Sequence, residues 1–215
     1  MKALLAIRRQ VLGRLKETSS VRRLFDPASQ SLREIYVGYL SRVVGQYTPH
    51  SPKVMALAAS RCADTHPELG AYLLRHALEE QGHDEWARQD LRALGVAETA
   101  IRAAQPVVSC TAMIGYTYYI AGHSNPVGLF GWMYVLEAIG SDFGAEAAAL
   151  LKQRLPGSTD AVRFITGHGV ADETHAQELS EQIERHILER EDRAEVQRVA
   201  AVTGELYVRM FEEIG

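Results

Sequence analysis

Apolar residues at helical spacing constrain this chain more than any other feature of its sequence. Between residues 32 and 47 they recur every third or fourth position, at Leu32, Ile35, Tyr36, Tyr39, Leu40, Val43, Val44 and Tyr47. This spacing places them on one face of an α-helix, whereas alternation of apolar and polar residues would predict a strand. Residues 2–17 and 192–213 repeat the pattern, and no stretch has the signals of a β-hairpin or a βαβ unit. The sequence therefore predicts an all-α protein.

Three longer helices are predicted over about 68–94, 126–154 and 160–188, because proline, glycine and polar residues bound these stretches. The second of them contains Gly128, Gly131, Gly140 and Gly144. Each glycine weakens a helix by roughly 1 kcal/mol relative to alanine, so we interpret them as points of close helix contact or as a bend beside a site. With 215 residues and no internal repeat, the chain is expected to form one domain, residues 1–215, of seven to eight helices around one core.

Charge and composition exclude several classes of protein. A net charge of −4 gives no electrostatic footprint for nucleic acid. No apolar run reaches membrane-spanning length, so no membrane partner is expected. The basic residues interspersed through positions 1–16 do not follow the order of a signal peptide. Two cysteines do not make a disulfide framework, which favours a reduced, cytoplasmic chain.

The predicted helix over 160–188 carries a first set of candidate metal ligands, His168, Asp172 and His175. Residues four and seven apart lie close to one line on a helix, so these side chains point into one small volume. Imidazole and carboxylate groups together bind iron, manganese or zinc. The alternative is a solvated polar face.

A second set lies in the predicted helix over 68–94, where Glu80 and His83 form a Glu-x-x-His pair. On one helix, such a pair supplies an oxygen and a nitrogen to the same metal, as in carboxylate-bridged di-iron bundles. His76 and Glu79 lie on nearby faces of the same helix. They are candidates either for metal ligands or for groups that hold a ligand in place, and the alternative for the whole set is a solvated surface.

Glu137 completes the candidate site from the predicted helix over 126–154. It lies within the apolar and small residues 132–140, where a buried carboxylate needs a partner such as a metal or an arginine. The three helices together offer three carboxylates and three imidazoles. This set is too rich for one structural zinc with four ligands, and it suits two iron ions with open positions for oxygen. Glu80, His83 and Glu137 are expected to serve one ion, and His168, Asp172 and His175 the other.

The pattern Glu80-x-x-His83, Glu137 and His168-x-x-x-Asp172-x-x-His175 resembles the ligand pattern of the heme-oxygenase-like di-iron oxidases and oxygenases. The resemblance covers roughly residues 30–190 in helix order. It implies the heme-oxygenase-like helical bundle that TenA-type thiaminases and the pyrroloquinoline quinone synthase share. It also implies two iron ions, as Fe2+ and Fe3+, that act with dioxygen. Manganese is an alternative metal, and no heme is expected, because no histidine precedes His50.

One position departs from that family pattern. Seven residues before the helix histidine, some relatives have a glutamate ligand, whereas this chain has His76. The first ligand helix is therefore left open among His76, Glu79 and Glu80. TenA-like chemistry would need a cysteine nucleophile, and Cys110, in an apolar segment, is expected to be buried and inert.

These features predict a non-heme di-iron oxidase or oxygenase whose partners are dioxygen and a small molecule of amino-acid, amine or acyl type. Candidates for its substrate pocket are aromatic residues near Glu137, namely Tyr116, Tyr119, Trp132 and Tyr134. A homodimer is expected by analogy with the fold and from the apolar faces of the first and last helices. The alternatives are a metal-free ligand-binding protein and a cofactor-free oxidase on the same fold, which would use the histidines as acids and bases.

Overall fold

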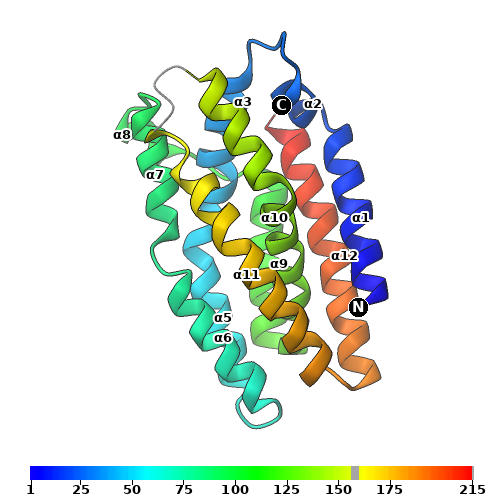
Figure 1. Ribbon diagram of the computed structural model, residues 1–215. Coiled ribbons are helices and arrows are strands. Elements are labelled where there is room, and N and C mark those ends of the chain that lie inside the picture. Colours follow the sequence, from blue (N-terminus) through cyan, green and yellow to red (C-terminus); the bar gives the residue numbers. More distant parts are fainter. Residues whose placement is uncertain (156–159, 215) are drawn as a thin grey trace.

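The computed structural model describes residues 1–155 and 160–214, apart from the side chains of residues 170–174. All regular structure in this part of the chain is helical (Figure 1), so the all-α prediction is confirmed. The first half contains α1 (Lys2–Glu17), α2 (Ser19–Phe25), α3 (Leu32–Tyr39), the π-helix η1 (Leu40–Val44), α4 (Gly45–Tyr47), the 3₁₀-helix η2 (Thr48–His50), α5 (Ser51–Cys62), α6 (Pro67–Glu79), α7 (His83–Ala93) and α8 (Glu98–Ala103). The second half contains α9 (Val108–His123), the 3₁₀-helix η3 (Pro126–Gly128), α10 (Leu129–Arg154), α11 (Arg163–His186) and α12 (Arg190–Glu213).

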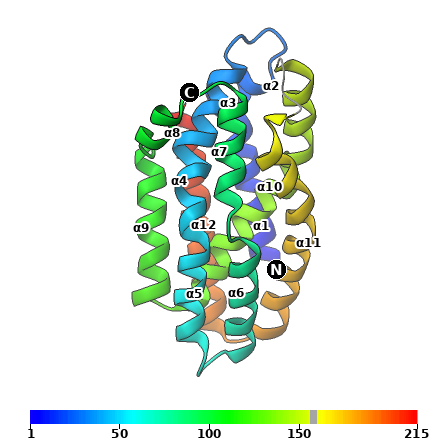
Figure 2. The same ribbon diagram turned by 90° about the vertical axis from the view of Figure 1, so that its left-hand side faces the viewer.

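The long helices form an elongated bundle with α10 at its centre. Helix α10 packs against α11 and α12, while α1 packs against α12 and α5 against α6. Figures 1 and 2 show α11 crossing α10 on one side, with α6 and α7 following one another along the neighbouring edge. The buried apolar residues form one cluster that extends from Leu4 in α1 to Met210 in α12. This arrangement surrounds the N-terminal half of α10, where Glu137 lies, with helices.

Two glycines of α10 allow this close packing. A Cβ atom on Gly131 would lie 2.1 Å from the carbonyl oxygen of Val196 in α12. A Cβ atom on Gly144 would lie 3.1 Å from the Cα atom of Gly169 in α11. Larger side chains at these positions would push α10 away from its neighbours, so the interpretation of the α10 glycines as contact points is confirmed for these two.

The prediction of one continuous helix over 68–94 is wrong. Helix α6 ends at Glu79 and α7 begins at His83, and between them Gly82 adopts a φ of 92°. This left-handed conformation is common at helix ends and is open to glycine at little cost. Helix α7 then starts with Asp84 and Glu85 in its first turn, where carboxylates interact favourably with the helix dipole.

The bundle has more helical segments than the seven to eight expected, because stretches predicted as single helices are interrupted. The predicted helix over 32–47 contains the π-helical turn η1 between α3 and α4, and the predicted helix over 68–94 is divided as described. Among the helices of the described residues, none combines the length and apolar character needed to cross a membrane.

Candidate metal centre

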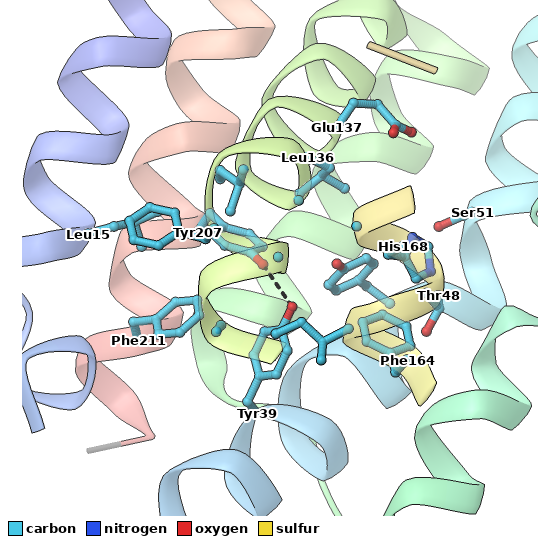
Figure 3. A pocket seen from close by; sticks show the side chains of 18 of the residues that line it. Leu15, Tyr39, Thr48, Ser51, Leu136, Glu137, Phe164, His168, Tyr207 and Phe211 are labelled. Carbon is cyan, nitrogen blue, oxygen red and sulfur yellow. Dashed lines mark hydrogen bonds between the residues drawn. The ribbon is translucent and has the colours of Figure 1, made fainter. Parts of the chain in front are cut away.

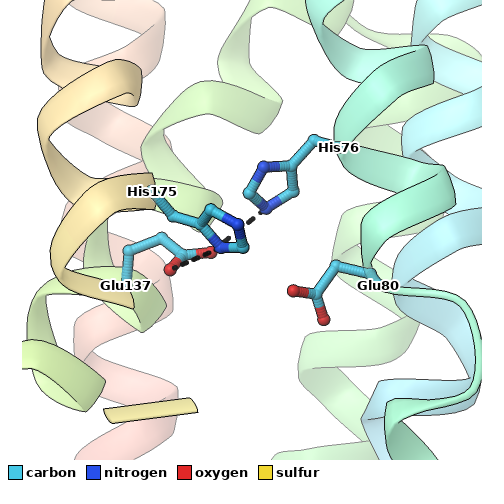
Figure 4. A group of neighbouring side chains, drawn as sticks. All are labelled: His76, Glu80, Glu137 and His175. Carbon is cyan, nitrogen blue, oxygen red and sulfur yellow. Dashed lines mark hydrogen bonds and ion pairs between the residues drawn. The ribbon is translucent and has the colours of Figure 1, made fainter. Parts of the chain in front are cut away.

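Four side chains from α6, α10, α11 and the break after α6 point toward one another (Figure 4). These are His76, Glu80, Glu137 and His175, and each offers a nitrogen or oxygen atom within 4.8 Å of the others'. His76 Nε2 lies 3.2 Å from Glu137 Oε1, and His175 Nδ1 lies 3.7 Å from Glu137 Oε2. The imidazole centroids of His76 and His175 are 4.5 Å apart. We call these four residues the inner group, because His76 is only 2% exposed and Glu80 and Glu137 are buried as well.

A second group of candidate ligands, the outer group, consists of Glu80, His83 and His168. Its nitrogen and oxygen atoms also lie within 4.8 Å of one another. His83 Nδ1 is 3.2 Å from Glu80 Oε2, and the rings of His83 and His168 meet edge to face with centroids 4.9 Å apart. Glu80 belongs to both groups, so its carboxylate lies where it can offer one oxygen to each of two ions.

The local electrostatics keep the shared carboxylate ionised. Burial alone would raise the pKa of Glu80, but the hydrogen bond from His83 and the charges of His168, His83 and His76 outweigh it and lower that pKa below the ordinary value. A buried carboxylate among imidazoles is the donor set that divalent iron, manganese or zinc binds. The described residues therefore fit two metal ions by chemistry and by spacing.

The break between α6 and α7 determines how the side chains of Glu80 and His83 meet. Glu80 follows the last residue of α6 and His83 is the first residue of α7, so the pair does not lie on one helix. The backbone still turns tightly, with the His83 N–H 3.4 Å from the Glu80 carbonyl oxygen. The two side chains meet as the Glu-x-x-His spacing predicts, although the reason is a turn at Gly82 rather than helical geometry.

Trp86 holds the outer-group imidazoles in place. Its ring stacks on His83 at a centroid distance of 4.0 Å and an angle of 22°, and it forms a T-shaped pair with His168 at a centroid distance of 5.8 Å. Gly167 makes room for the indole, because a Cβ atom there would lie 2.6 Å from Trp86 Cζ3. The sequence analysis missed Trp86, although its position three residues after His83 put it on the same face of a helix.

Asp90 fixes the beginning of α11, the helix that carries His168 and His175. Its two carboxylate oxygens accept hydrogen bonds from the backbone N–H groups of Arg163 and Phe164, both at 2.9 Å. Tyr36 donates a third hydrogen bond to the carboxylate, at 3.2 Å. Asp90 thus caps α11 from another helix, and the sequence analysis missed it because such a cap leaves no local sequence pattern.

The structure brings together five of the six predicted ligands, namely Glu80, His83, Glu137, His168 and His175. The sixth, Asp172, lies in α11, and its side chain is outside the described residues. The candidate ligands are distributed over the two groups differently from what the sequence analysis expected. Glu137 and His175 lie together in the inner group, whereas His168 lies with His83 in the outer group.

The two further candidates in α6, His76 and Glu79, differ in their burial and in their position relative to the ligand groups. His76 belongs to the inner group. Glu79 is 51% exposed and lies at the rim, with Oε2 3.8 Å from His76 Nδ1 and 3.5 Å from His175 Nε2. From this position on the solvent side, the Glu79 carboxylate can orient both imidazoles.

An apolar cavity adjoins the metal groups and is lined partly by Glu137 and His168 (Figure 3). Of the four aromatic residues expected to line a pocket, Trp132 does so. The other three are not among its lining residues, which corrects that expectation. Tyr116 accepts a hydrogen bond from Arg198, Tyr119 is 54% exposed, and Tyr134 interacts with Arg8.

The aromatic residues that do line the cavity, besides Trp132, come from helices remote in sequence from Glu137, except for Phe143, which lies in α10 itself. They are Phe25, Tyr36, Tyr39, Tyr47, Phe143, Phe164, Tyr207 and Phe211. Their spacing is that of ordinary core residues, so the sequence contains no signal that separates cavity-lining positions from packed ones.

A helical bundle of this kind, with buried carboxylates and imidazoles between its central helices, belongs to the heme-oxygenase-like fold class. The chain is similar over 98% of its length to a domain of unknown function with a heme oxygenase-like fold from Shewanella denitrificans, with a TM-score of 0.87, 21% identity and 89% of that chain covered. It is also similar to a TenA homolog from Pseudomonas syringae pv. tomato, with a TM-score of 0.76, 13% identity, and 99% and 91% of the two chains covered.

Residues 40–208 match the family model described as iron-containing redox enzyme, and the protein therefore belongs to this family. No curated protein shows significant similarity to the chain. The two solved structures share too little identity to indicate more than the fold. Cys110 is fully buried, and burial raises the pKa of its thiol to about 12, so it does not supply a thiolate nucleophile near neutral pH.

Proposed function

We propose that this protein is a non-heme di-iron oxidase or oxygenase that uses dioxygen to oxidise a small organic substrate. The observation that carries the proposal is the pair of ligand groups that share Glu80 beside an apolar cavity. The outer group offers two histidines and one carboxylate, the donor set of non-heme Fe(II) oxygenases with open coordination positions. The inner group offers two histidines and two carboxylates. Membership of the iron-containing redox enzyme family supports iron as the metal.

When bound, two iron ions would supply the electrons and the open positions that dioxygen reduction needs. The chain's own groups hold that chemistry in place. Glu80 and Glu137 offset positive charge in a buried setting, where uncompensated charge is costly. The indole of Trp86 fixes the ring plane of His83, and Glu79 stands beside the imidazoles of His76 and His175. The apolar wall of the cavity excludes water from the substrate.

The metal assignment is tested by iron content. Metal-free protein is loaded with Fe(II) under argon, desalted and analysed by inductively coupled plasma mass spectrometry. We expect about two irons per chain, as in other two-metal sites. Glu80→Ala is expected to lose most of both, because this carboxylate belongs to both groups. Glu85→Ala, an exposed carboxylate paired with Arg92, is the matched control and should load as the unsubstituted protein does. Full loading of Glu80→Ala would contradict the proposal.

Oxygen consumption by the Fe(II)-loaded protein separates the proposal from its alternatives. We expect consumption that depends on iron and stops when a strong chelator is added before loading. Manganese as the native metal would show as consumption restored by Mn(II) and not by Fe(II). A cofactor-free oxidase would continue to consume oxygen in the chelator, and a binding protein would consume none under any condition.

A further inference from the structure

Helix α9 carries no charged side chain, although one of its faces is open to solvent. Residues 103–136, which include the whole of α9, contain no aspartate, glutamate, lysine or arginine. A helix that lacks charge on every face is typical of a buried position. Figure 2, however, shows α9 at one edge of the bundle, with α11 at the opposite edge. The composition of α9 therefore indicates a contact that a single copy of the chain does not supply.

The exposed face of α9 consists of apolar and small uncharged residues. Val108 is 79% exposed and Tyr119 is 54% exposed. Thr111, Ala112 and Gly115 are exposed between them, and intervals of three and four residues place all five on one side of the helix. Depletion of charge and enrichment of tyrosine are the composition of a protein interface at its core. We call these five residues the α9 face.

The α9 face is complementary to a second copy of itself. Its large residues, Val108 and Tyr119, lie at the two ends, and its smallest residues, Ala112 and Gly115, lie between them. The midpoint of each pair falls between residues 113 and 114, so a twofold axis there exchanges the members of each pair. Two antiparallel helices would then place Ala112 of each copy opposite Gly115 of the other, where their backbones can approach closely. Such an interface uses the same surface on both copies, as twofold dimers do.

Helix α12, which runs antiparallel to α9, carries complementary charges at the two ends of that face. Near the start of α9, the Ser109 N–H donates to the carboxylate of Glu213 at 3.3 Å. Further along α9, Arg198 donates to the Tyr116 hydroxyl at 3.1 Å. Glu213 and Arg198 are both exposed, and Arg198, although it also pairs with Glu195, has further N–H groups to donate. The twofold axis that reverses α9 brings Glu213 of each copy to the end where Arg198 of the other lies.

The area of the interface requires the helices beside α9 as well. The 16 residues of α9 form a face about 24 Å long and 10 Å wide, or roughly 240 Å². A stable dimer buries about 800 Å² on each partner. Helices α5, α9 and α12 side by side offer roughly 700 Å² by the same dimensions. On the α5 side, Leu57 is 36% exposed and continues the apolar surface, because a Cβ atom on Gly122 of α9 would lie 3.4 Å from its Cδ2 atom.

We propose that the α9 face is the centre of a twofold homodimer interface, with α5 and α12 at its sides. The partner is a second copy of the chain, because the face matches itself both in the order of its side chains and in the charges beside it. The sequence analysis expected the first and last helices to form the interface. In this proposal α12 contributes one side and α1 contributes nothing. The ligand groups, between α6, α7, α10 and α11, lie outside the interface, so the proposal does not depend on the metal.

The first test is sedimentation velocity of the full chain between about 0.1 and 100 µM, a range that reaches the weaker dimers of this size. The measured mass should rise toward twice the 23.8 kDa of one chain. Gly115→Glu places two carboxylates beside the twofold axis and should weaken the dimer about hundredfold, because like charges in an interface are costly. A chain that stays monomeric over the whole range would overturn the proposal.

Gly13→Glu is the matched control for this substitution. Gly13 is exposed on α1, and a Cβ atom there, as at Gly115, would have no atom of the described residues within 4 Å. Both variants should fold, since glutamate favours a helix more than glycine does, and circular dichroism establishes that they do. Gly13→Glu should dimerise as the unsubstituted protein does. Equal dimerisation of the two variants would place the interface elsewhere and overturn the proposal.

Exchange of charges tests the twofold arrangement itself and decides the question even if a glycine variant does not fold. Arg198→Glu places acidic groups opposite acidic groups, and Glu213→Arg places basic groups opposite basic groups, so each variant alone should dimerise more weakly than the unsubstituted protein. An equimolar mixture restores an opposite pair at both ends. It should therefore form heterodimers about tenfold more tightly than either variant forms homodimers. A mixture that associates no more tightly than the separate variants would overturn the antiparallel arrangement.

Discussion

Glu80 belongs to both ligand groups, and each of the side chains around it belongs to one group or the other. His76 and Glu137 lie on the inner side, and His83 and His168 lie on the outer side. Residue type and spacing in the sequence indicated these positions, although Glu80 and His83 meet through the turn at Gly82 and do not share one helix face. This information was not sufficient to divide them, since that depends on how three separate helices are placed against one another.

This division makes a prediction for single histidine variants. His76→Ala should remove mainly the inner ion and His83→Ala mainly the outer ion, so that each variant retains roughly one of the two ions of a two-metal site. The double variant should retain almost none. Iron per chain after anaerobic loading measures all three, with His123→Ala, a histidine outside both groups, as control. Loss of both ions in each single variant would show that the groups do not load separately.

Trp86 offers a direct signal for the outer group. The chain has two tryptophans, so Trp132→Phe leaves Trp86 as the sole indole emitter. A paramagnetic ion held by His83 would quench its fluorescence, because the two rings stack at 4.0 Å. Titration with Mn(II) should therefore reduce emission in this variant. The same titration of Trp132→Phe/His83→Ala should leave emission nearly constant, and equal quenching in both would contradict outer-group binding at His83.

At the scale of elements, the helices were largely predictable and their interruptions were not. The periodicity located α1, α10, α11 and α12 within a few residues of their bounds. The break at Gly82 escaped because apolar periodicity continues on both sides, and a single glycine in a helix is tolerated often enough to be no clear signal. The cap on α11 escaped because Asp90 lies in a different helix from the backbone groups that it binds.

The cap predicts a measurable stability effect. Asp90→Ala would leave two backbone N–H groups of α11 without their buried acceptor, at a cost of about 2–3 kcal/mol in the free energy of unfolding. Tyr36→Phe removes only one of the three hydrogen bonds and should cost about 1 kcal/mol. Urea denaturation followed by circular dichroism measures both. A smaller effect for Asp90→Ala than for Tyr36→Phe would contradict the capping role.

The packing of α1 against α12 includes an ion pair whose pH dependence follows from its pKa. The guanidinium groups of Arg14 and Arg209 lower the pKa of Glu205 to about 2. Because the native state binds this proton more weakly than the unfolded chain, the contribution to stability is present above pH 4.5 and is lost as the pH falls toward 2. These groups are 40% or more exposed, so the contribution is at most about 1 kcal/mol. The free energies of unfolding of Glu205→Gln and of the unsubstituted protein are measured from pH 7 to 2.5. The two values should converge at the acid end.

At the scale of the whole molecule, the helices enclose both ligand groups and an apolar cavity in one bundle. The fold class followed from helical periodicity and from the absence of strand signals, and the solved structures and the family model agree with it. A substrate pocket near Glu137 was expected, but most of its wall could not be predicted, since the wall is assembled from α1 to α6 and from α10, α11 and α12. Side chains from so many segments have no shared pattern in the sequence.

Since the ligand groups join α6, α7, α10 and α11, metal binding should stabilise the entire bundle. At a metal concentration 100 times the dissociation constant, one binding event adds about 2.7 kcal/mol to the free energy of unfolding. For a chain of this size that corresponds to a rise of roughly 5–10 °C in Tm. Differential scanning calorimetry with and without Mn(II) measures the shift, and Glu80→Ala should show little of it. An unchanged Tm in the unsubstituted protein would contradict binding across these helices.

The sharing of one carboxylate also has a thermodynamic consequence. Two ions that both used the Glu80 side chain would not bind independently, so their affinities would be linked by a coupling free energy. That coupling is reciprocal, and the factor by which the inner ion alters the affinity of the outer ion equals the factor in the other direction. Ordering of Glu80 by a first ion would favour a second, while repulsion between the cations would oppose it. The shape of the loading isotherm, steeper or shallower than that of independent sites, reports which of these two effects is larger.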